Sequence, residues 1–221
     1  MSPEILVLIV KATFQTLQMV AVSGIIGSLI GIPLGIFLAT SGKGELFAAP
    51  FTNKVLGIIV NAARSTPFII LVVAIIPFTR LIAGTSIGTT AAIVPLTVAT
   101  VPFVARLVEA AIREVNPGLI EAARAMGATP LQIVFKVLLS EAKPGITLAL
   151  TLTVVSLIGY SAMVGAVGGG GLGDLGIRYG YQRFMPDVML VVVLVLIVLV
   201  QLIQSAGDAL ARRADKRNRP R

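Results

Sequence analysis

Gly171, Gly173 and Gly176 have the G-x-G-x-x-G spacing of loops that bind a dinucleotide phosphate. Such a loop needs a strand before it, a helix after it and an acidic residue about 20 positions further on. That position falls here in an apolar stretch without charge. We therefore expect no nucleotide site, and we predict that the glycines of residues 165–176 form a compact turn and a re-entrant segment.

Other catalytic patterns are missing from the sequence. Lys43 follows Gly42, but position 37 is phenylalanine, so no G-x-x-x-x-G-K-[ST] phosphate loop is present. The sequence contains no cysteine and no histidine, which excludes disulfides, thiolate or imidazole metal ligands, and the nucleophilic sites built on these residues. We predict that the chain is not an enzyme, holds no metal and no cofactor, and leaves any ATP hydrolysis to another subunit.

The polar segment over residues 113–144 is too structured for a passive linker. Asn116 can cap a short helix that has Pro117 at its first position, and Gly127 can end this helix in a left-handed turn. A capping-box pattern then predicts a second short helix. Thr129, Pro130 and Gln132 form its start, and Pro144 is its expected stop. The loop is the main candidate for binding a partner, and a surface hairpin without a partner is the alternative.

The elements that must position this loop are apolar. Of the 221 residues, 56% are hydrophobic and 13% are charged, whereas soluble domains have about 25% charged residues. We predict an all-α membrane protein with one transmembrane domain over residues 1–221. A second helix starting near Val55 would carry Arg64 close to the head groups. The five expected transmembrane helices all reach the roughly 20 residues that a span needs, and they cover residues 13–41, 55–79, 82–106, 145–167 and 187–208.

The basic residues indicate an orientation. Fourteen of the eighteen lysines and arginines lie between spans one and two, between spans three and four, or after span five, if Arg64 near the start of span two and Arg106 at the end of span three are counted with the adjoining loops. Because cytoplasmic loops carry the excess positive charge, we expect the amino terminus outside, and the loop and the carboxyl terminus in the cytoplasm. Topology then explains the net charge of +8 without nucleic acid. The basic tail over 209–221 is expected to be solvated, and binding to anionic membrane lipid is the alternative.

Three glycines in the first span predict close helix packing. Gly27, Gly31 and Gly35 recur every four residues, and Pro33 adds a kink. The uncharged stretch around them has 31 residues, which exceeds the 7 to 15 of a signal-peptide core. We therefore expect a retained span.

Polar side chains inside apolar spans are candidates for lining a translocation pathway, and hydrogen bonds to neighbouring helices are the alternative for each. In the fourth span, Met163 adds a flexible thioether to this set. At the start of the second span, Thr66 and Pro67 are expected to loosen the helix. The candidates are Asn61, Ser65, Ser156, Tyr160, Ser161 and Met163.

Within the loop, Glu121-Ala122-Ala123, then Gly127, then Val137 and Leu139 resemble the EAA loop of binding-protein-dependent ABC import permeases. In two places the match departs from the family, which usually has isoleucine at position 137 and commonly a proline at position 140. The resemblance implies that the loop forms a coupling helix that inserts into a cleft on an ATPase subunit. The residues it implies for this contact are Glu121, Ala122, Ala123, Met126, Gly127, Thr129 and Pro130.

Segments along most of the chain look like the methionine-importer branch of this family. They are residues 63–71, 77–88, 121–132, 159–163 and 170–173. This resemblance implies a multi-pass protein of the bacterial inner membrane that carries L- and D-methionine into the cytoplasm by alternating access. It also implies a homodimer of this chain, two ATPase subunits that bind ATP and Mg, and an external substrate-binding lipoprotein.

Three alternatives stay open at this point. The first is an ABC permease for another small amino acid or peptide, because the coupling loop indicates the motor and not the cargo. The second is an ion-coupled secondary carrier, although no predicted span has a central charge and five spans cannot form two equal inverted repeats. The third is an assembly subunit, which would leave the loop around Glu121 unexplained.

Overall fold

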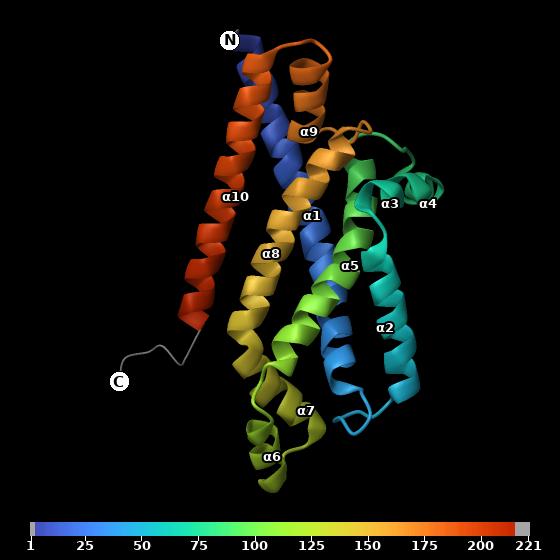
Figure 1. Ribbon diagram of the computed structural model, residues 1–221, viewed down its shortest axis with the longest axis vertical. Helices are drawn as coiled ribbons and strands as arrows, with labels where there is room; N and C mark the ends of the chain where they lie inside the picture. Colours follow the sequence, from blue (N-terminus) through green and yellow to red (C-terminus); the bar gives the residue numbers. More distant parts are fainter. Residues whose placement is uncertain (1–2, 215–221) are drawn as a thin grey trace. The chain divides into compact units, whose positions relative to one another are not determined.

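The computed structural model describes residues 3–214, and all regular structure in this range is helical (Figure 1). The prediction of an all-α chain is therefore confirmed for these residues. The tail residues 215–221 of the predicted basic segment lie outside the described residues. The elements are α1 (Pro3–Thr40), α2 (Pro50–Ser65), α3 (Phe68–Ala74), α4 (Ile76–Ala83), α5 (Thr89–Arg113), α6 (Pro117–Ala125), α7 (Pro130–Gln132), the π-helical η1 (Ile133–Leu138), α8 (Leu139–Gly165), α9 (Gly171–Leu175), the π-helical η2 (Gly176–Tyr181) and α10 (Pro186–Ala214).

Four helices within residues 3–214 are long and apolar enough to cross a membrane: α1, α5, the continuous helix Pro130–Gly165 and α10. A fifth span exists if α2 and α3 count as one, because together they have the required length and composition. They are bent by 102° at a short break. The break lies at Thr66 and Pro67, where the sequence predicted a loosened helix, so the span expected over 55–79 is not one straight helix.

The prediction that Pro144 ends a short second helix is wrong. α7, η1 and α8 follow one another without interruption, and Pro144 lies inside α8. A proline removes one backbone hydrogen bond, but membrane helices tolerate this loss when neighbouring helices continue to pack against them. Here Leu138 and Ala142 are buried in the same core on the N-terminal side of the proline, which keeps the helix in place.

The chain divides into two compact units. Among the described residues, the first unit comprises 3–27, 66–100 and 153–204, and the second comprises 28–65, 101–152 and 205–214. In the first unit, one core joins α1, α3, α5, α8 and α10 around Met19, Leu96 and Leu157. Another joins α9 to α1 and α10, as Figure 1 shows. In the second unit, one core joins α1, α5, α6, η1 and α8.

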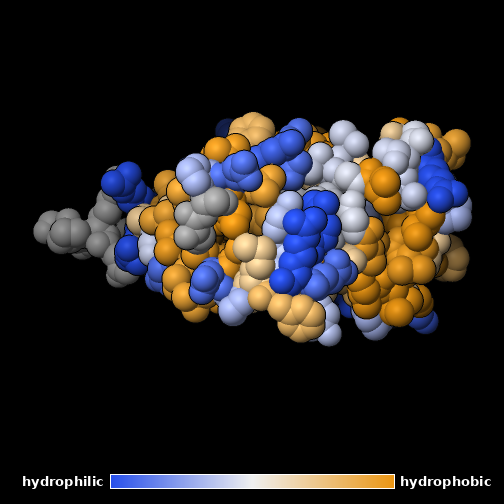
Figure 2. Space-filling view, turned by 90° about the horizontal axis from the view of Figure 1, so that it is seen from above, coloured by the Kyte–Doolittle hydropathy of each residue, from blue (hydrophilic) through white to orange (hydrophobic). Residues whose placement is uncertain are grey.

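Many large apolar side chains stay on the surface, as expected for helices that face lipid. On α1 the exposed set includes Val7, Val10, Phe14 and Leu29, and on α10 it includes Leu190, Ile197 and Leu202. Figure 2 shows hydrophobic areas between hydrophilic patches on one face. In a water-soluble monomer such apolar areas would be unusual.

Candidate functional site

The first part of the loop, over residues 116–132, has the local geometry that its sequence predicted. Asn116 Oδ1 accepts a hydrogen bond from the Gly118 amide at 2.9 Å and caps α6. Gly127 follows α6 with φ +78°, which is the left-handed turn that favours glycine. In the capping box before α7, the Thr129 amide donates to Gln132 Oε1 at 2.9 Å, and the Gln132 amide donates to Thr129 Oγ1 at 3.4 Å. Both predicted caps are confirmed.

This loop presents an apolar surface with charged neighbours. Met126 has 82% of its surface exposed, and Leu131 and Phe135 are also exposed. Glu121, Ala122, Gly127, Thr129 and Pro130 from the predicted set are exposed as well. We call Glu121, Ala122, Met126, Leu131 and Phe135 the loop surface. Leu131 and Phe135 were not predicted from the sequence, although their four-residue spacing on a helix was a usable signal.

Ala123 does not belong to the loop surface. It is 3% exposed and packs in the core of the second unit with Val115 of the α5–α6 connection and Ile133 of η1. Its small side chain thus permits a close approach within this chain, at the point where α6 meets the end of α5. Of the alanines expected at a partner, only Ala122 is exposed.

A charged cluster near the end of α5 was not predicted. Arg106 Nη1 donates to Glu109 Oε2 at 2.5 Å, and Arg113 Nη2 donates to Glu109 Oε1 at 2.9 Å. Arg106 also reaches α2, because its Nε donates to Asn61 Oδ1 and its Nη2 donates to the Gly57 carbonyl, both at 3.1 Å. The Glu109 side chain is 8% exposed and that of Arg106 is 23% exposed. A single arginine therefore bridges two helices of the second unit.

The candidate pathway residues are divided between the two units. In the second unit, Ser65 Oγ donates to the Asn61 carbonyl at 2.9 Å, and both residues are exposed. In the first unit, Ser161 is buried and donates to the Ile158 carbonyl at 2.7 Å. Tyr160 stacks on Phe68 with ring centroids 4.5 Å apart. Met163 is exposed and Ser156 is half-buried. A lining role for these six residues stays a prediction.

The predicted glycine stripe packs closely against α5, as expected. A Cβ on Gly31 would lie 2.8 Å from the Val101 carbonyl oxygen, and one on Gly35 would lie 2.5 Å from the Ala105 carbonyl oxygen, both within the second unit. In the first unit, a Cβ on Gly27 would collide with the Thr100 side chain. Because real Cβ atoms do not approach backbone so closely, this part of α1 requires glycine.

The glycine-rich segment after α8 is held by α1 in the first unit. The Gly171 amide donates to Gln15 Oε1 at 3.1 Å, and the Leu172 amide donates to Thr16 Oγ1 at 2.9 Å. Gly168, Gly170 and Gly171 all have positive φ. The segment follows a helix, α8, rather than a strand, which agrees with the rejection of a dinucleotide loop.

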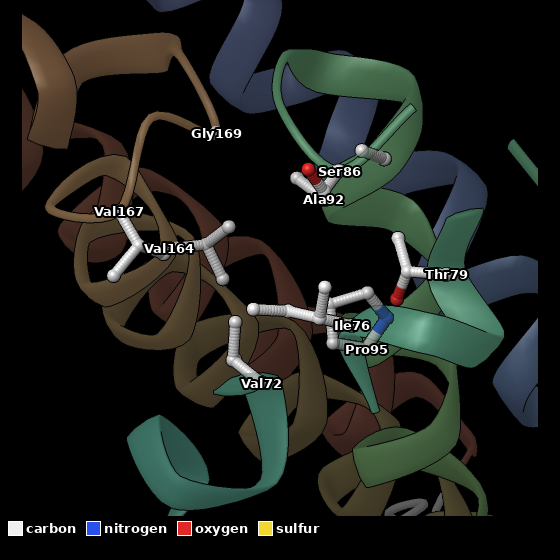
Figure 3. Close-up of a pocket in the computed structure, with 10 residues that line it drawn as sticks. Val72, Ile76, Thr79, Ser86, Ala92, Pro95, Val164, Val167 and Gly169 are labelled. Carbon is white, nitrogen blue, oxygen red and sulfur yellow. The ribbon is translucent and has the colours of Figure 1, made fainter. Parts of the chain in front are cut away.

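A small cavity lies beside this segment in the first unit (Figure 3). Its walls include Val72, Ile76, Val164 and Val167, together with Thr79 and Ser86, the only two hydroxyls in the set. The cavity volume of about 20 Å³ has room for about one water molecule. It is therefore not a site for an amino acid in this conformation.

Comparisons with known proteins place the chain in a family. Residues 31–219 match the model of the binding-protein-dependent transport system inner membrane component. A probable D-methionine transport system permease protein MetI from Vibrio cholerae is 59% identical over 95% of this chain and 93% of its own length. The D-methionine transport system permease protein MetI of Escherichia coli K12 is 54% identical over 75% of this chain and 76% of its own length.

Solved structures agree with this assignment. An inward-facing MetNI methionine ABC transporter structure contains a chain that is 52% identical, with a TM-score of 0.95 over 98% of this chain and all of its own. An amino acid ABC transporter solved with histidines shares the fold at 21% identity, with a TM-score of 0.77 over 93% of this chain and 94% of its own. The chain therefore belongs to the family of binding-protein-dependent transport system inner membrane components.

Proposed function

We propose that this chain is the membrane-spanning permease subunit of an ATP-driven importer that carries methionine, in both the L- and the D-form, into the cytoplasm. The main support is that a 52% identical chain of a methionine ABC transporter superimposes on this chain with a TM-score of 0.95. Relatives that are about half identical or more are named D-methionine permeases. Transport proceeds by alternating access, and the chemistry of ATP belongs to a separate subunit.

The working assembly contains two copies of this chain, two ATPase subunits that bind ATP and Mg, and an external substrate-binding lipoprotein. The name of the matched family, which refers to binding proteins, supports the last partner. The amino terminus lies outside and the carboxyl terminus lies in the cytoplasm. The distribution of lysine and arginine supports this orientation, because it places fourteen of eighteen basic residues on the inner side.

The loop surface is the contact with the ATPase subunit. It has the properties of a recognition site, because it combines the exposed side chains of Met126, Leu131 and Phe135 with the exposed carboxylate of Glu121. The caps at Asn116 and Thr129 hold its two helices in place without the partner. Protein partners recognise such pre-formed surfaces with little loss of conformational entropy.

The loop contact predicts a large effect of Glu121→Ala on assembly. The substitution removes an exposed carboxylate, so the protein should still insert in the membrane while the amount of co-purified ATPase falls at least about fivefold. Glu141→Ala is the matched control, because Glu141 is an exposed carboxylate in the first turn of α8. Equal ATPase recovery in the two variants would show that Glu121 is not at the contact.

Uptake of labelled methionine tests the proposed function. The chain is expressed with its ATPase and binding protein in cells that lack methionine uptake, and unlabelled L- and D-amino acids are added as competitors. The proposal is supported if labelled methionine enters in an ATP-dependent manner and only unlabelled methionine inhibits this entry. If the ATPase co-purifies but another amino acid or a peptide enters instead, the importer assignment stands and the substrate is wrong.

A further inference from the structure

Arg106 makes three contacts that fix its guanidinium on two helices. One nitrogen binds the Glu109 carboxylate on α5, and the other two bind Asn61 Oδ1 and the Gly57 carbonyl on α2. Gly57 and Asn61 are four residues apart and therefore lie on one face of α2 in successive turns. The planar guanidinium spans both turns, so α2 cannot slide along α5 or rotate without losing a charged hydrogen bond.

The cluster is not explained by stability alone. Charged groups that are mostly withdrawn from solvent contribute little net stability compared with apolar side chains of similar size. Glu109 is nearly buried, yet it binds two arginines, of which Arg113 is 58% exposed and makes its bond within α5. What Arg106 adds is the link to α2, which an apolar side chain could not orient in this way.

One core joins α6 to the part of α5 that carries Arg106. Ala123 of α6 packs with Val115 and Ile112, and the same core continues along α5 through Val108 and Val104. α5 has no break between Thr89 and Arg113. Because packed interiors transmit displacements instead of absorbing them, a movement of α6 is passed to this end of α5.

We propose that Arg106 is a positioning residue that makes α2 follow α5 when the ATPase subunit moves the loop. The inference rests on the proposed function, because the movement is supplied by that partner. α2 ends at Ser65, and its last turns carry the exposed polar side chains of Asn61 and Ser65. Arg106 thus links the loop to the helix that carries two of the candidate pathway residues.

The ratio of transport to ATP hydrolysis tests this role. The complete transporter is reconstituted in vesicles with its binding protein, and methionine uptake is divided by ATP hydrolysed. Arg106→Gln should keep hydrolysis within about twofold and lower the uptake per ATP at least about tenfold. Arg113→Gln removes the other arginine on Glu109 without touching α2, and its ratio should stay within about twofold of the native value.

Asn61→Ala keeps the test valid if Arg106→Gln fails to insert. Asn61 is exposed, so its truncation removes one α2 contact and leaves the Arg106–Glu109 pair intact. The uptake per ATP should fall at least about threefold. Arg106→Lys keeps the positive charge but not the planar guanidinium that binds both helices, so its uptake per ATP should also fall. The proposal would be overturned if Asn61→Ala and Arg106→Lys both kept the native uptake per ATP. It would also be overturned if Arg113→Gln lowered this ratio as much as Arg106→Gln does.

A distance measurement separates this inference from the substrate assignment. The sequence has no cysteine, so spin labels attach only at introduced sites, and Lys54→Cys on α2 with Ala110→Cys on α5 are both exposed positions. With one labelled copy per transporter, the label distance should be the same with and without trapped nucleotide, and should change between these states in Arg106→Gln. A native distance that changes overturns the proposal. If distances behave as expected but methionine does not enter, only the substrate is wrong.

Discussion

The two units fix their key segments by opposite means. In the first unit, uncharged side chains of α1 accept hydrogen bonds from the backbone of the glycine-rich segment, through Gln15 to Gly171 and through Thr16 to Leu172. In the second unit, the long charged side chain of Arg106 reaches from α5 to α2. The first arrangement brings the backbone of the segment against side chains of α1, whereas the second joins two helices through the full length of one arginine side chain.

This difference indicates different mechanical roles. The contact at Gly171 tolerates little displacement, because a Cβ there would lie 2.6 Å from Thr16 Oγ1 and 2.8 Å from Met19 Cε. The Arg106 bridge needs no such close packing, because one long side chain holds both helices through charged hydrogen bonds. We interpret the glycine-rich segment as a fixed part of the first unit and the Arg106 bridge as a link that keeps α2 and α5 together when they move.

Gly171→Ala should have the largest effect. Gly171 has φ +77°, and an added Cβ would lie 2.6 Å from Thr16 Oγ1 and 2.8 Å from Met19 Cε. Left-handed strain of about 1–2 kcal/mol and overpacking of about 1–3 kcal/mol predict a loss of about 3 kcal/mol in unfolding free energy. Denaturant unfolding in detergent measures this loss.

Gly84→Ala is the matched control for that experiment. Gly84 has a similar φ of +71°, but nothing lies within 4 Å of the added Cβ. Only the backbone strain remains, so the loss should be about 1 kcal/mol. Equal losses of unfolding free energy in Gly171→Ala and Gly84→Ala would mean that the close contact of Gly171 with α1 leaves no room-dependent cost, and that only backbone strain destabilises the variants.

The parts of the fold that the sequence predicted are governed by neighbouring residues. The cap at Asn116, the turn at Gly127 and the capping box at Thr129 depend on side chains within three residues of the backbone they bind. The glycine stripe of α1 was also predictable, because a four-residue repeat repeats on one helix face whatever lies opposite. The apolar spans follow from composition in the same way.

The parts that were missed depend on residues far apart in the sequence. Arg106 contacts Asn61 across 45 residues, and Thr16 contacts Leu172 across 156 residues. Neither pair produces a repeating pattern in the sequence, because each is a single hydrogen bond between two residues. Pro144 shows the converse case, in which a strong local signal for a helix end was overridden by the core packing of Leu138 and Ala142.

Glu109→Gln should have the second largest effect, this time in the second unit. The substitution keeps the size of the side chain but leaves the guanidinium groups of Arg106 and Arg113 without their carboxylate. Because the Glu109 side chain is only 8% exposed, we expect a loss of about 2 kcal/mol in unfolding free energy. Glu114→Gln, at an exposed position just after α5, should change it by less than about 0.5 kcal/mol. A Glu109→Gln variant as stable as Glu114→Gln would show that the cluster is solvated.

Thr16→Val should have the smallest effect and tests the other side of the comparison. Valine keeps the shape of the buried threonine but cannot accept the hydrogen bond from the Leu172 amide. An unsatisfied buried amide predicts a loss of about 1–2 kcal/mol and faster hydrogen exchange at Leu172. Thr13→Val is the control, because the Thr13 hydroxyl donates to the Ile9 carbonyl of its own helix and orients no other segment. If exchange at Leu172 is unchanged in Thr16→Val while Gly171→Ala is strongly destabilised, close packing rather than hydrogen bonding fixes the segment.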